Sequence, residues 1–437
     1  MTEKNHFDGL NYENVYAAQK NMLPGTELSW LNDIRQSSMT KFVEVGLPGP
    51  KVEEWRYTNL TPLKSETYEI ADKSPSMSAD ILADLTVQEN TGSKVVFING
   101  YFSEAHSKIV SQSGIILKSL PDFLKSDQNS AQALLSSLDK QNSLEHLNTA
   151  LMTGGYVLQV EENVKLAEPI EIFHIATKGA EAKALRSKCF IEMKSQSSAC
   201  VIEHFSSPDG FDIWRDNVTR AQLSNGSFLS IYSFQCEGSE VIHMNRVLAD
   251  LGEDAEFRHQ SLNVGGKISR TEVKPTLNGL FAKTNLRGAF LGREGSSHDV
   301  FTHMKHMVPQ GTSDQIYRGV LDKGGKSAFQ GKAYVAKDAQ LTNADQSNKN
   351  LLLDRGAEAN SKPELLIYAD DVKCSHGATV GELDDQALFY LESRGLDKNA
   401  AKGLLVEAFI AEVFEEIDLE AVKARYLDLA RKWLDKG

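Results

Sequence analysis

The spacing of apolar residues divides the 437-residue chain into three parts, and the first part is mostly helical. From Thr26 to Val45 apolar residues recur at helical spacing, and residues 122–152 return to the same pattern. Between them Lys94–Ile98, which ends at Asn99-Gly100, predicts a strand and a tight turn. We therefore expect residues 1–150 to form a mixed, mostly helical domain.

The second part, residues 151–381, has a β-rich pattern. Twenty-one of the thirty-one glycines lie between Gly154 and Gly381, and no window there keeps a helical period. Short strands that each begin just after a turn residue favour a β-solenoid, in which every coil stacks on the last. A β-sandwich is the rival, with Asn225-Gly226 and Asn278-Gly279 as hairpin turns. The predicted strand pieces are Ala199–Glu203, Ser227–Ile231, Ala255–His259, Leu280–Lys283, His298–Phe301 and Ser327–Gln330.

The third part, residues 382–437, predicts a helical domain. Asp384 or Asp385 can cap a first helix that stops at Gly395, and a second helix follows. The third helix begins after Asp418 and repeats apolar residues at spacings of three and four, which is typical of a stripe that packs on another helix. Packing within the chain and a partner surface are both compatible with this stripe. Its members are Leu419, Val422, Tyr426, Leu429 and Trp433.

Composition and charge narrow the function classes. The net charge of -13 disfavours a nucleic-acid partner, which needs a basic face. No apolar run is long enough to cross a bilayer, and the first residues lack the apolar core of a signal peptide, so no membrane partner is expected. The four cysteines are widely spread with no C-x-x-C, which fits reduced thiols. We expect a cytoplasmic protein.

Cys374 and His376 are the residues most suggestive of chemistry. Side chains two apart on an extended backbone share a face, so this pair can offer sulfur and nitrogen to one metal centre. Iron–sulfur and zinc sites usually take three or four protein ligands, so the rest would come from elsewhere in the fold or from a second chain. The alternative is a buried cysteine beside a locally satisfied histidine.

Two further patterns are similar to functional motifs, a phosphate-binding loop and a histidine metal site. Residues 319–327 are one residue out of register for a phosphate-binding loop, and a strand follows where a helix is needed, so we expect no nucleotide to bind this chain. His298, His303 and His306 are closely spaced, but His303 would face away from the other two on one strand. Turn or surface histidines are favoured here over a metal site.

Several short motifs lie between Tyr317 and Phe409, and another, Glu54–Thr58, lies near the start. Those of the later region are Tyr317–Leu321, Gln330–Lys332, Ala344–Asn348, Asn350–Leu353, Lys362–Leu365, Tyr368–Gly381 and Leu388–Gly395. Together these motifs resemble the SufB/SufD family of iron–sulfur cluster assembly scaffolds. The absence of a cysteine before Cys189 favours the SufD branch of that family over the SufB branch.

The resemblance implies a right-handed parallel β-helix between helical ends. It also implies a complex of one SufB, one SufD and two SufC ATPase subunits. A homodimer of the chain when it is alone is an open alternative that the resemblance does not decide. A transient iron–sulfur cluster would form at the SufB interface, near His376 as the principal residue and Cys374 as a secondary one. The C-terminal helices would bind SufC, through Leu388, Phe389, Leu391, Arg394, Tyr426, Leu429 and Trp433.

Two enzyme classes compete with a non-catalytic scaffold. A β-helix carbohydrate enzyme needs paired acidic or basic groups along a groove and is usually exported, and the sequence offers neither feature. A free-standing metal enzyme needs a complete set of ligands in one chain. We therefore expect a scaffold without catalytic activity of its own.

Overall fold

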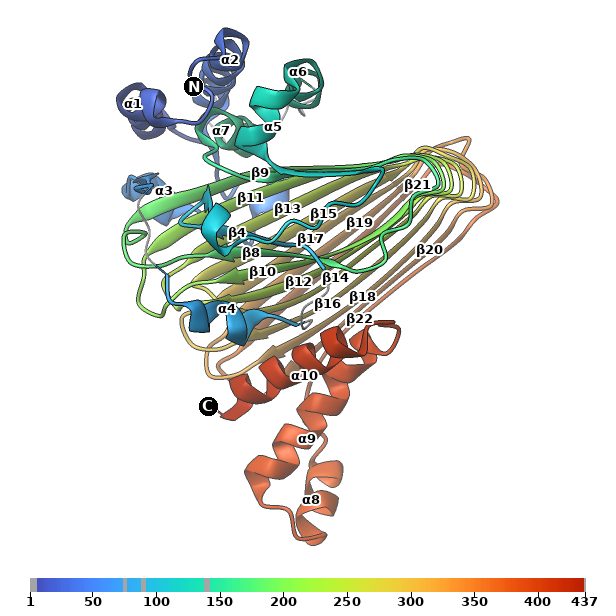
Figure 1. Cartoon of the computed structure of the whole chain (residues 1–437). Helices are drawn as coiled ribbons and strands as arrows, with labels where there is room; N and C mark the ends of the chain where they lie inside the picture. Colours follow the sequence, from blue (N-terminus) through green and yellow to red (C-terminus); the bar gives the residue numbers. More distant parts are fainter. Residues whose placement is uncertain (1–5, 74–76, 88–91, 137–141, 436–437) are drawn as a thin grey trace, which may run out of the picture.

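Two long parallel sheets form the body of the molecule (Figure 1). The computed structural model describes residues 6–73, 77–87, 92–136 and 142–435. Successive strands alternate between the two sheets, so that each coil adds one strand to each sheet and pairs in parallel with the coil before it. The predicted parallel β-helix is confirmed. The sandwich alternative is wrong, because the Asn225-Gly226 turn joins β11 and β12, which lie in different sheets.

Both sheets contain ten strands. Sheet I runs β22 (Lys373–Glu382), β20 (Asn343–Leu352), β18 (Thr312–Leu321), β16 (Lys283–Gly292), β14 (Glu256–Gly265), β12 (Phe228–Glu237), β10 (Ser198–Ser206), β8 (Ile170–Ile175), β4 (Lys94–Ile98) and β5 (Tyr101–Phe102). Sheet II runs β21 (Glu358–Ile367), β19 (Lys326–Val335), β17 (Ser297–His306), β15 (Ile268–Leu277), β13 (Ile242–Leu251), β11 (Ile213–Leu223), β9 (Lys183–Met193), β7 (Tyr156–Val160) and β6 (Ile115–Ser119), with β3 (Glu69–Ile70) beside β9.

The space between the sheets, here called the lumen, holds an aliphatic core. Alternate residues of each strand point into it, and parallel register stacks them coil upon coil, as for Val201 and Ile231. Toward the last coils the stacked positions become polar, with Gln315 beneath Gln346. The early coils are thus held by apolar burial, and the last coils present polar groups near the end of the solenoid.

Most of the N-terminal helices lie against the outer face of sheet II, whereas α4 (Ala79–Leu85) packs on β4 and β8 of sheet I (Figure 1). The predicted helix over Thr26 to Val45 is present as α2, although it starts at Ser29 because Leu28 is extended. The predicted strand at Lys94–Ile98 is β4, so the first 150 residues also supply early strands of the solenoid. The remaining elements are β1 (His6–Phe7), β2 (Leu47–Pro48), α1 (Leu10–Gln19), η1 (Lys20–Met22), α2 (Ser29–Val45), η2 (Glu53–Trp55), α3 (Thr61–Ser65), α4 (Ala79–Leu85), η3 (Glu104–His106), α5 (Leu120–Ser126), α6 (Gln128–Ser136) and α7 (Ser143–Leu151).

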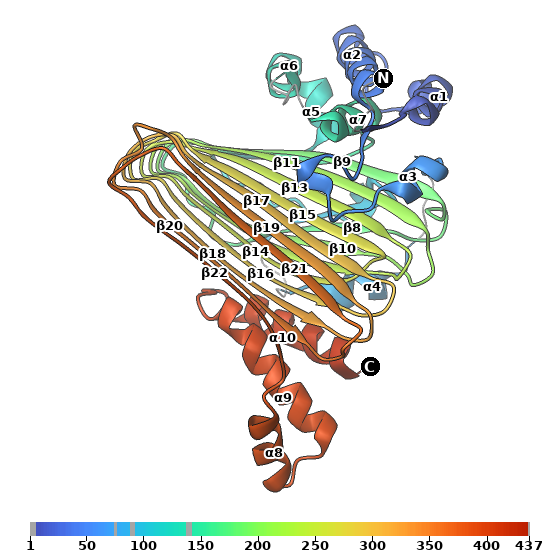
Figure 2. The same cartoon turned by 180° about the vertical axis from the view of Figure 1, so that it is seen from behind.

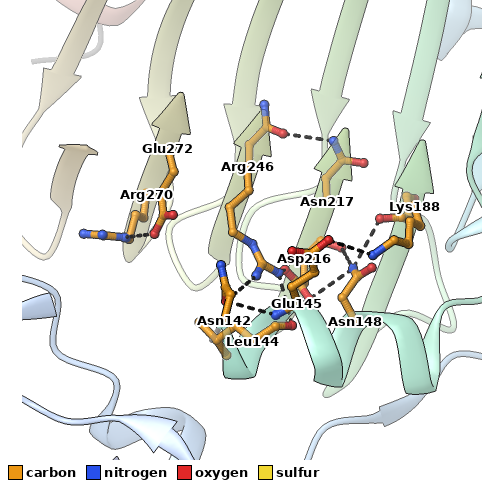
Figure 3. A network of polar contacts seen from close by, with 12 residues as sticks. Asn142, Leu144, Glu145, Asn148, Lys188, Asp216, Asn217, Arg246, Arg270 and Glu272 are labelled. Carbon is orange, nitrogen blue, oxygen red and sulfur yellow. Dashed lines mark hydrogen bonds and ion pairs between the residues drawn. The ribbon is translucent and has the colours of Figure 1, made fainter. Parts of the chain in front are cut away.

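Helix α7 is buried along its whole length and is fixed to sheet II by charged side chains (Figure 3). Glu145 accepts hydrogen bonds from Lys188 Nζ at 3.2 Å and from Arg220 Nε at 2.7 Å. Asp216 pairs with Arg246 and accepts from Asn148 Nδ2. Buried charges of this kind need their partners, because an uncompensated charge in the interior is costly.

The C-terminal helices lie on the opposite side of the solenoid, against sheet I (Figures 1 and 2). They are α8 (Asp385–Ser393), α9 (Lys398–Ala411), η4 (Glu412–Phe414) and α10 (Glu420–Asp435). Asp384 caps α8 and Gly395 ends it with a φ of 96°, as predicted. Helix α10 lies along the sheet, whereas the α8–α9 hairpin projects away from it. Among the helices described, none has the length and apolar character required to cross a bilayer.

Candidate functional site at the end of the solenoid

Cys374 and His376 lie on β22, the last strand of sheet I. The strand runs through both residues, so they share a face as predicted. Cys374 is partly buried and packs against Val335, Ala339 and Ala369, which identifies this face as the one toward the lumen. His376 is exposed because the solenoid ends at this coil. The structure thus brings both predicted side chains to the open mouth of the lumen.

The last coil has two free edges. β21 ends the order of sheet II as β22 ends that of sheet I, and each is ten residues long. Residues of both strands are exposed or partly exposed, in contrast to the buried strands before them. An edge strand presents a row of backbone N–H and C=O groups that can pair with another chain. The end of the solenoid is therefore a template for strand addition.

The Cys374 thiol is protonated at neutral pH. Burial raises its pKa, and the nearby Asp345 carboxylate raises it further. The thiolate is the form that ligates metals, so binding of iron at Cys374 would release a proton.

The three neighbouring histidines do not converge. His298, His303 and His306 all lie on β17, and His303 points to the face opposite the other two, as predicted. The prediction of turn or surface histidines is wrong for His298 and His306, because β17 is a central strand and both are buried in the lumen, whereas His303 is partly exposed on the outer face. Burial lowers the pKa of His298 and His306 to about 4, and each stays neutral. Within the described ranges, no group of three or more His, Cys, Asp or Glu side chains is placed to hold a metal.

Helix α8 carries three of the predicted partner-binding residues and a fourth, Arg394, is its C-cap; the helix has no buried residue among those described. Phe389 is 71 % exposed, and Leu388 and Leu391 are partly exposed beside it. The Arg394 guanidinium lies over the Tyr390 ring at 5.1 Å. A large exposed aromatic side chain with apolar neighbours on a projecting hairpin is typical of a docking surface.

The predicted partner role of Tyr426 and Trp433 is corrected by the structure. Tyr426 is fully buried, stacks on Phe234 at 4.3 Å and donates a hydrogen bond to the Gln260 carbonyl at 2.9 Å. Trp433 is buried beneath the Arg293 guanidinium, and Leu429 is partly buried in the same cluster. The apolar stripe of α10 packs on the chain's own sheet I, because burying it there removes a long apolar face from water.

The sequence similar to a phosphate-binding loop forms a turn between two strands. Gly319 lies in β18, and Lys326 and Ser327 begin β19. The predicted strand after the loop is confirmed, so these residues lack the helix N-terminus on which a phosphate loop depends.

Sequence reasoning missed two polar features. Glu145 and its partners Lys188 and Arg220 are 43 and 75 residues apart, and no local spacing links them. Gln346 lies directly beneath His376 in the register of β20 and β22, 30 residues earlier in the chain. The repeat length of a coil is the signal that would have paired these last two residues.

Comparisons with known proteins agree with this architecture. The profile described as "SUF system FeS cluster assembly, SufBD core domain" matches residues 174–409, and that described as "SufBD protein N-terminal region" matches residues 8–172. A SufBD family iron–sulfur cluster assembly protein of Synechocystis is 28 % identical, over 97 % of this chain and 96 % of its own. SufD of Escherichia coli is 29 % identical, over 90 % of each chain, and SufD of Bacillus subtilis is 24 % identical, over 93 % of this chain and 94 % of its own. The chain belongs to the SufB/SufD family of iron–sulfur cluster assembly proteins.

Proposed function

We propose that this chain is a SufD-like, non-catalytic scaffold subunit that helps to build a nascent iron–sulfur cluster at an interface with SufB, in a complex driven by the SufC ATPase. The observation that carries the proposal is the last coil of the solenoid. There Cys374 and His376 share the inner face of a strand whose outer edge is free to pair.

The chemistry of the pair supports a shared cluster. Thiolate sulfur and neutral imidazole nitrogen both ligate iron in iron–sulfur centres. Two side chains supply only part of a ligand set, and the rest would come from the chain that joins the solenoid's end. The cluster is cargo of the complex and is passed on once it is built.

The free edges of β21 and β22 support a partner with a similar solenoid. Adding strands to both edges would continue the two sheets across the junction and satisfy the exposed backbone groups. SufB, as the sister member of the family, is the expected partner. The same edges would pair two copies of this chain when SufB is absent.

The α8–α9 hairpin supports the assignment of the SufC contact. Leu388, Phe389, Leu391 and Arg394 lie on the part of the C-terminal domain that projects from the solenoid (Figures 1 and 2). Leu404 of α9 is also exposed, at 49 %. The ATPase would supply the nucleotide site and move the scaffold through this hairpin.

The test is cluster formation in complexes that carry single substitutions in this chain. We expect His376→Ala to leave the complex assembled but to abolish most iron and sulfide uptake in anaerobic reconstitution, with Cys374→Ala costing less. Thr379→Ala is the matched control, because Thr379 is exposed on the opposite face of the same strand. A wild-type cluster yield with His376→Ala would refute the proposed site, and a large loss with Cys374→Ala alone would reverse the two roles.

A further inference from the structure

A buried amide lies directly beneath His376. Gln346 of β20 is paired with His376 of β22 in the parallel register, and its side chain is only 3 % exposed. Neither its Nε2 nor its Oε1 has a hydrogen-bond partner among the described residues. Buried polar side-chain atoms are nearly always hydrogen-bonded, and each exception calls for an explanation.

The register places the Gln346 amide on the same face as the His376 imidazole. Their neighbours Asp345 and Ser375 face outward, and Ser375 Oγ donates to Asp345 Oδ1 at 2.5 Å. Because successive residues of a strand alternate in direction, Gln346 and His376 both point toward the lumen. Parallel strands are roughly 4.8 Å apart, so the two side chains are stacked neighbours.

Gly331 on the facing sheet makes room for this amide. A Cβ atom at residue 331 would lie 2.7 Å from Gln346 Oε1 and 2.7 Å from Phe329 Cζ. Any larger residue there would push against the amide and against the buried Phe329 ring. The sequence motifs around residues 331, 346 and 376 thus meet at one point, at the mouth of the lumen.

We propose that Gln346 is a positioning residue for His376. The two side chains are not hydrogen-bonded in the structure. In the proposed arrangement their side-chain torsions rotate so that the amide oxygen accepts the N–H of one imidazole nitrogen, which fixes the tautomer and directs the lone pair of the other nitrogen out of the lumen. Metal-binding histidines almost always donate their second nitrogen to such an acceptor. The assignment deepens the proposed function and rests on it for the role of the imidazole, while the proposed hydrogen bond needs only residues of this chain and can be tested without a partner.

Gln315, one coil deeper, provides a matched comparison. It lies beneath Gln346 in the register, and its Oε1 already accepts from Thr302 Oγ1 at 2.5 Å. Removing either amide alters the polar lining of the lumen, but only Gln346 is paired with His376. An effect confined to Gln346 therefore separates positioning from a general loss of lumen structure.

The experiment measures the tautomer of His376 by 15N NMR in the purified full chain labelled at histidine nitrogens, with His376→Ala to assign the signals. We expect one dominant tautomer in the wild type and with Gln315→Leu. Gln346→Leu should give the mixture of an unrestrained imidazole, and Gln346→Glu should restore one tautomer because an acceptor oxygen returns. A tautomer ratio unchanged by Gln346→Leu, or changed equally by Gln315→Leu, overturns the proposal.

Cluster formation in the complex gives the second readout. We expect Gln346→Leu to lower the affinity for iron by about tenfold, as is common when the hydrogen-bond partner of a ligand is removed. Gly331→Ala should act in the same direction, because its methyl group displaces the amide. If His376→Ala leaves cluster formation intact while the tautomer still depends on Gln346, the proposed function fails and the positioning contact stands. If cluster formation needs His376 and not Gln346, the positioning role fails.

Discussion

Replacing Glu145 by Gln tests the charged attachment of α7 to the solenoid. The carboxylate is fully buried and contacts Lys188 (Figure 3) and Arg220. The substitution keeps the shape of the side chain while removing its charge. Burial alone would raise the pKa of Glu145, but Lys188 and Arg220 outweigh it and lower the pKa from 4.5 to about 2. At about 1.4 kcal/mol per pKa unit, this shift corresponds to roughly 3 kcal/mol of stability.

The sign of the effect follows from the direction of the shift. A carboxylate with a lowered pKa stabilises the fold above pH 4.5, and this contribution is lost as the pH falls toward 2. At pH 7 we therefore expect Glu145→Gln to cost about 3 kcal/mol, within the range for breaking a buried ion pair. Burial lowers the pKa of Lys188 to about 8 even beside Glu145. Without the Glu145 charge the lysine loses its proton more readily, which removes the unpaired buried charge. The difference in unfolding free energy between the wild type and Glu145→Gln therefore narrows as the pH rises toward 8.

Hydrogen exchange of α7 and β9 measures this loss locally. A deficit of about 3 kcal/mol speeds exchange roughly a hundredfold, and urea unfolding gives the global value. Glu162→Gln is the control, because Glu162 is exposed and its loss should cost about 0.5 kcal/mol or less. Equal exchange rates in the two variants at pH 7 would refute the argument.

Three further predictions concern other parts of the chain. Burial raises the pKa of Glu203 to about 7, so the wild type loses stability as the pH rises from 4.5 to 7. Glu203→Gln should therefore be more stable than the wild type by roughly 3 kcal/mol at pH 8. Urea unfolding of both proteins at pH 5 and pH 8 measures this difference, and its absence at pH 8 would contradict the prediction. Phe389→Asp should weaken SufC binding at least about tenfold with an unchanged melting temperature, because charge in an apolar contact is costly. Ser393→Asp is the control on the same helix, and equal SufC binding by the two variants would rule out the hairpin surface. Tyr426→Ala should cost about 3 kcal/mol or more in urea unfolding, and wild-type stability would show that α10 does not depend on this packing.

The solenoid could be predicted because its turns are marked in the sequence. The predicted pieces at Ala199–Glu203 and Ser227–Ile231 start within one residue of β10 and β12. Their lengths were underestimated, since later halves of the strands carry polar residues such as Gln235 that face the lumen and interrupt the apolar pattern. Leu280 and Phe281 were wrongly assigned to a strand, because both apolar residues lie in a turn and Phe281 has a φ of 59°.

The candidate site was predictable only where its residues are close in sequence. Cys374 and His376 are two apart, so alternation alone places them on one face. Gln346 lies next to His376 only because one coil of the solenoid separates them in the sequence. The predicted strand pieces are irregularly spaced, so they did not reveal the number of residues in a coil. The helical stripe of α10 was equally visible, but periodicity cannot show whether such a stripe packs on its own chain or on another.

Pulsed EPR of the reduced cluster in the assembled complex tests the central claim most directly. Only this chain is labelled with 15N-histidine, and it is combined with unlabelled SufB and SufC before reconstitution. The account predicts a 15N hyperfine coupling from an imidazole bound to iron, which disappears with His376→Ala and persists with Thr379→Ala. A coupling that survives His376→Ala, or one seen only when the partner chains carry the label, would contradict a cluster shared at the end of this solenoid.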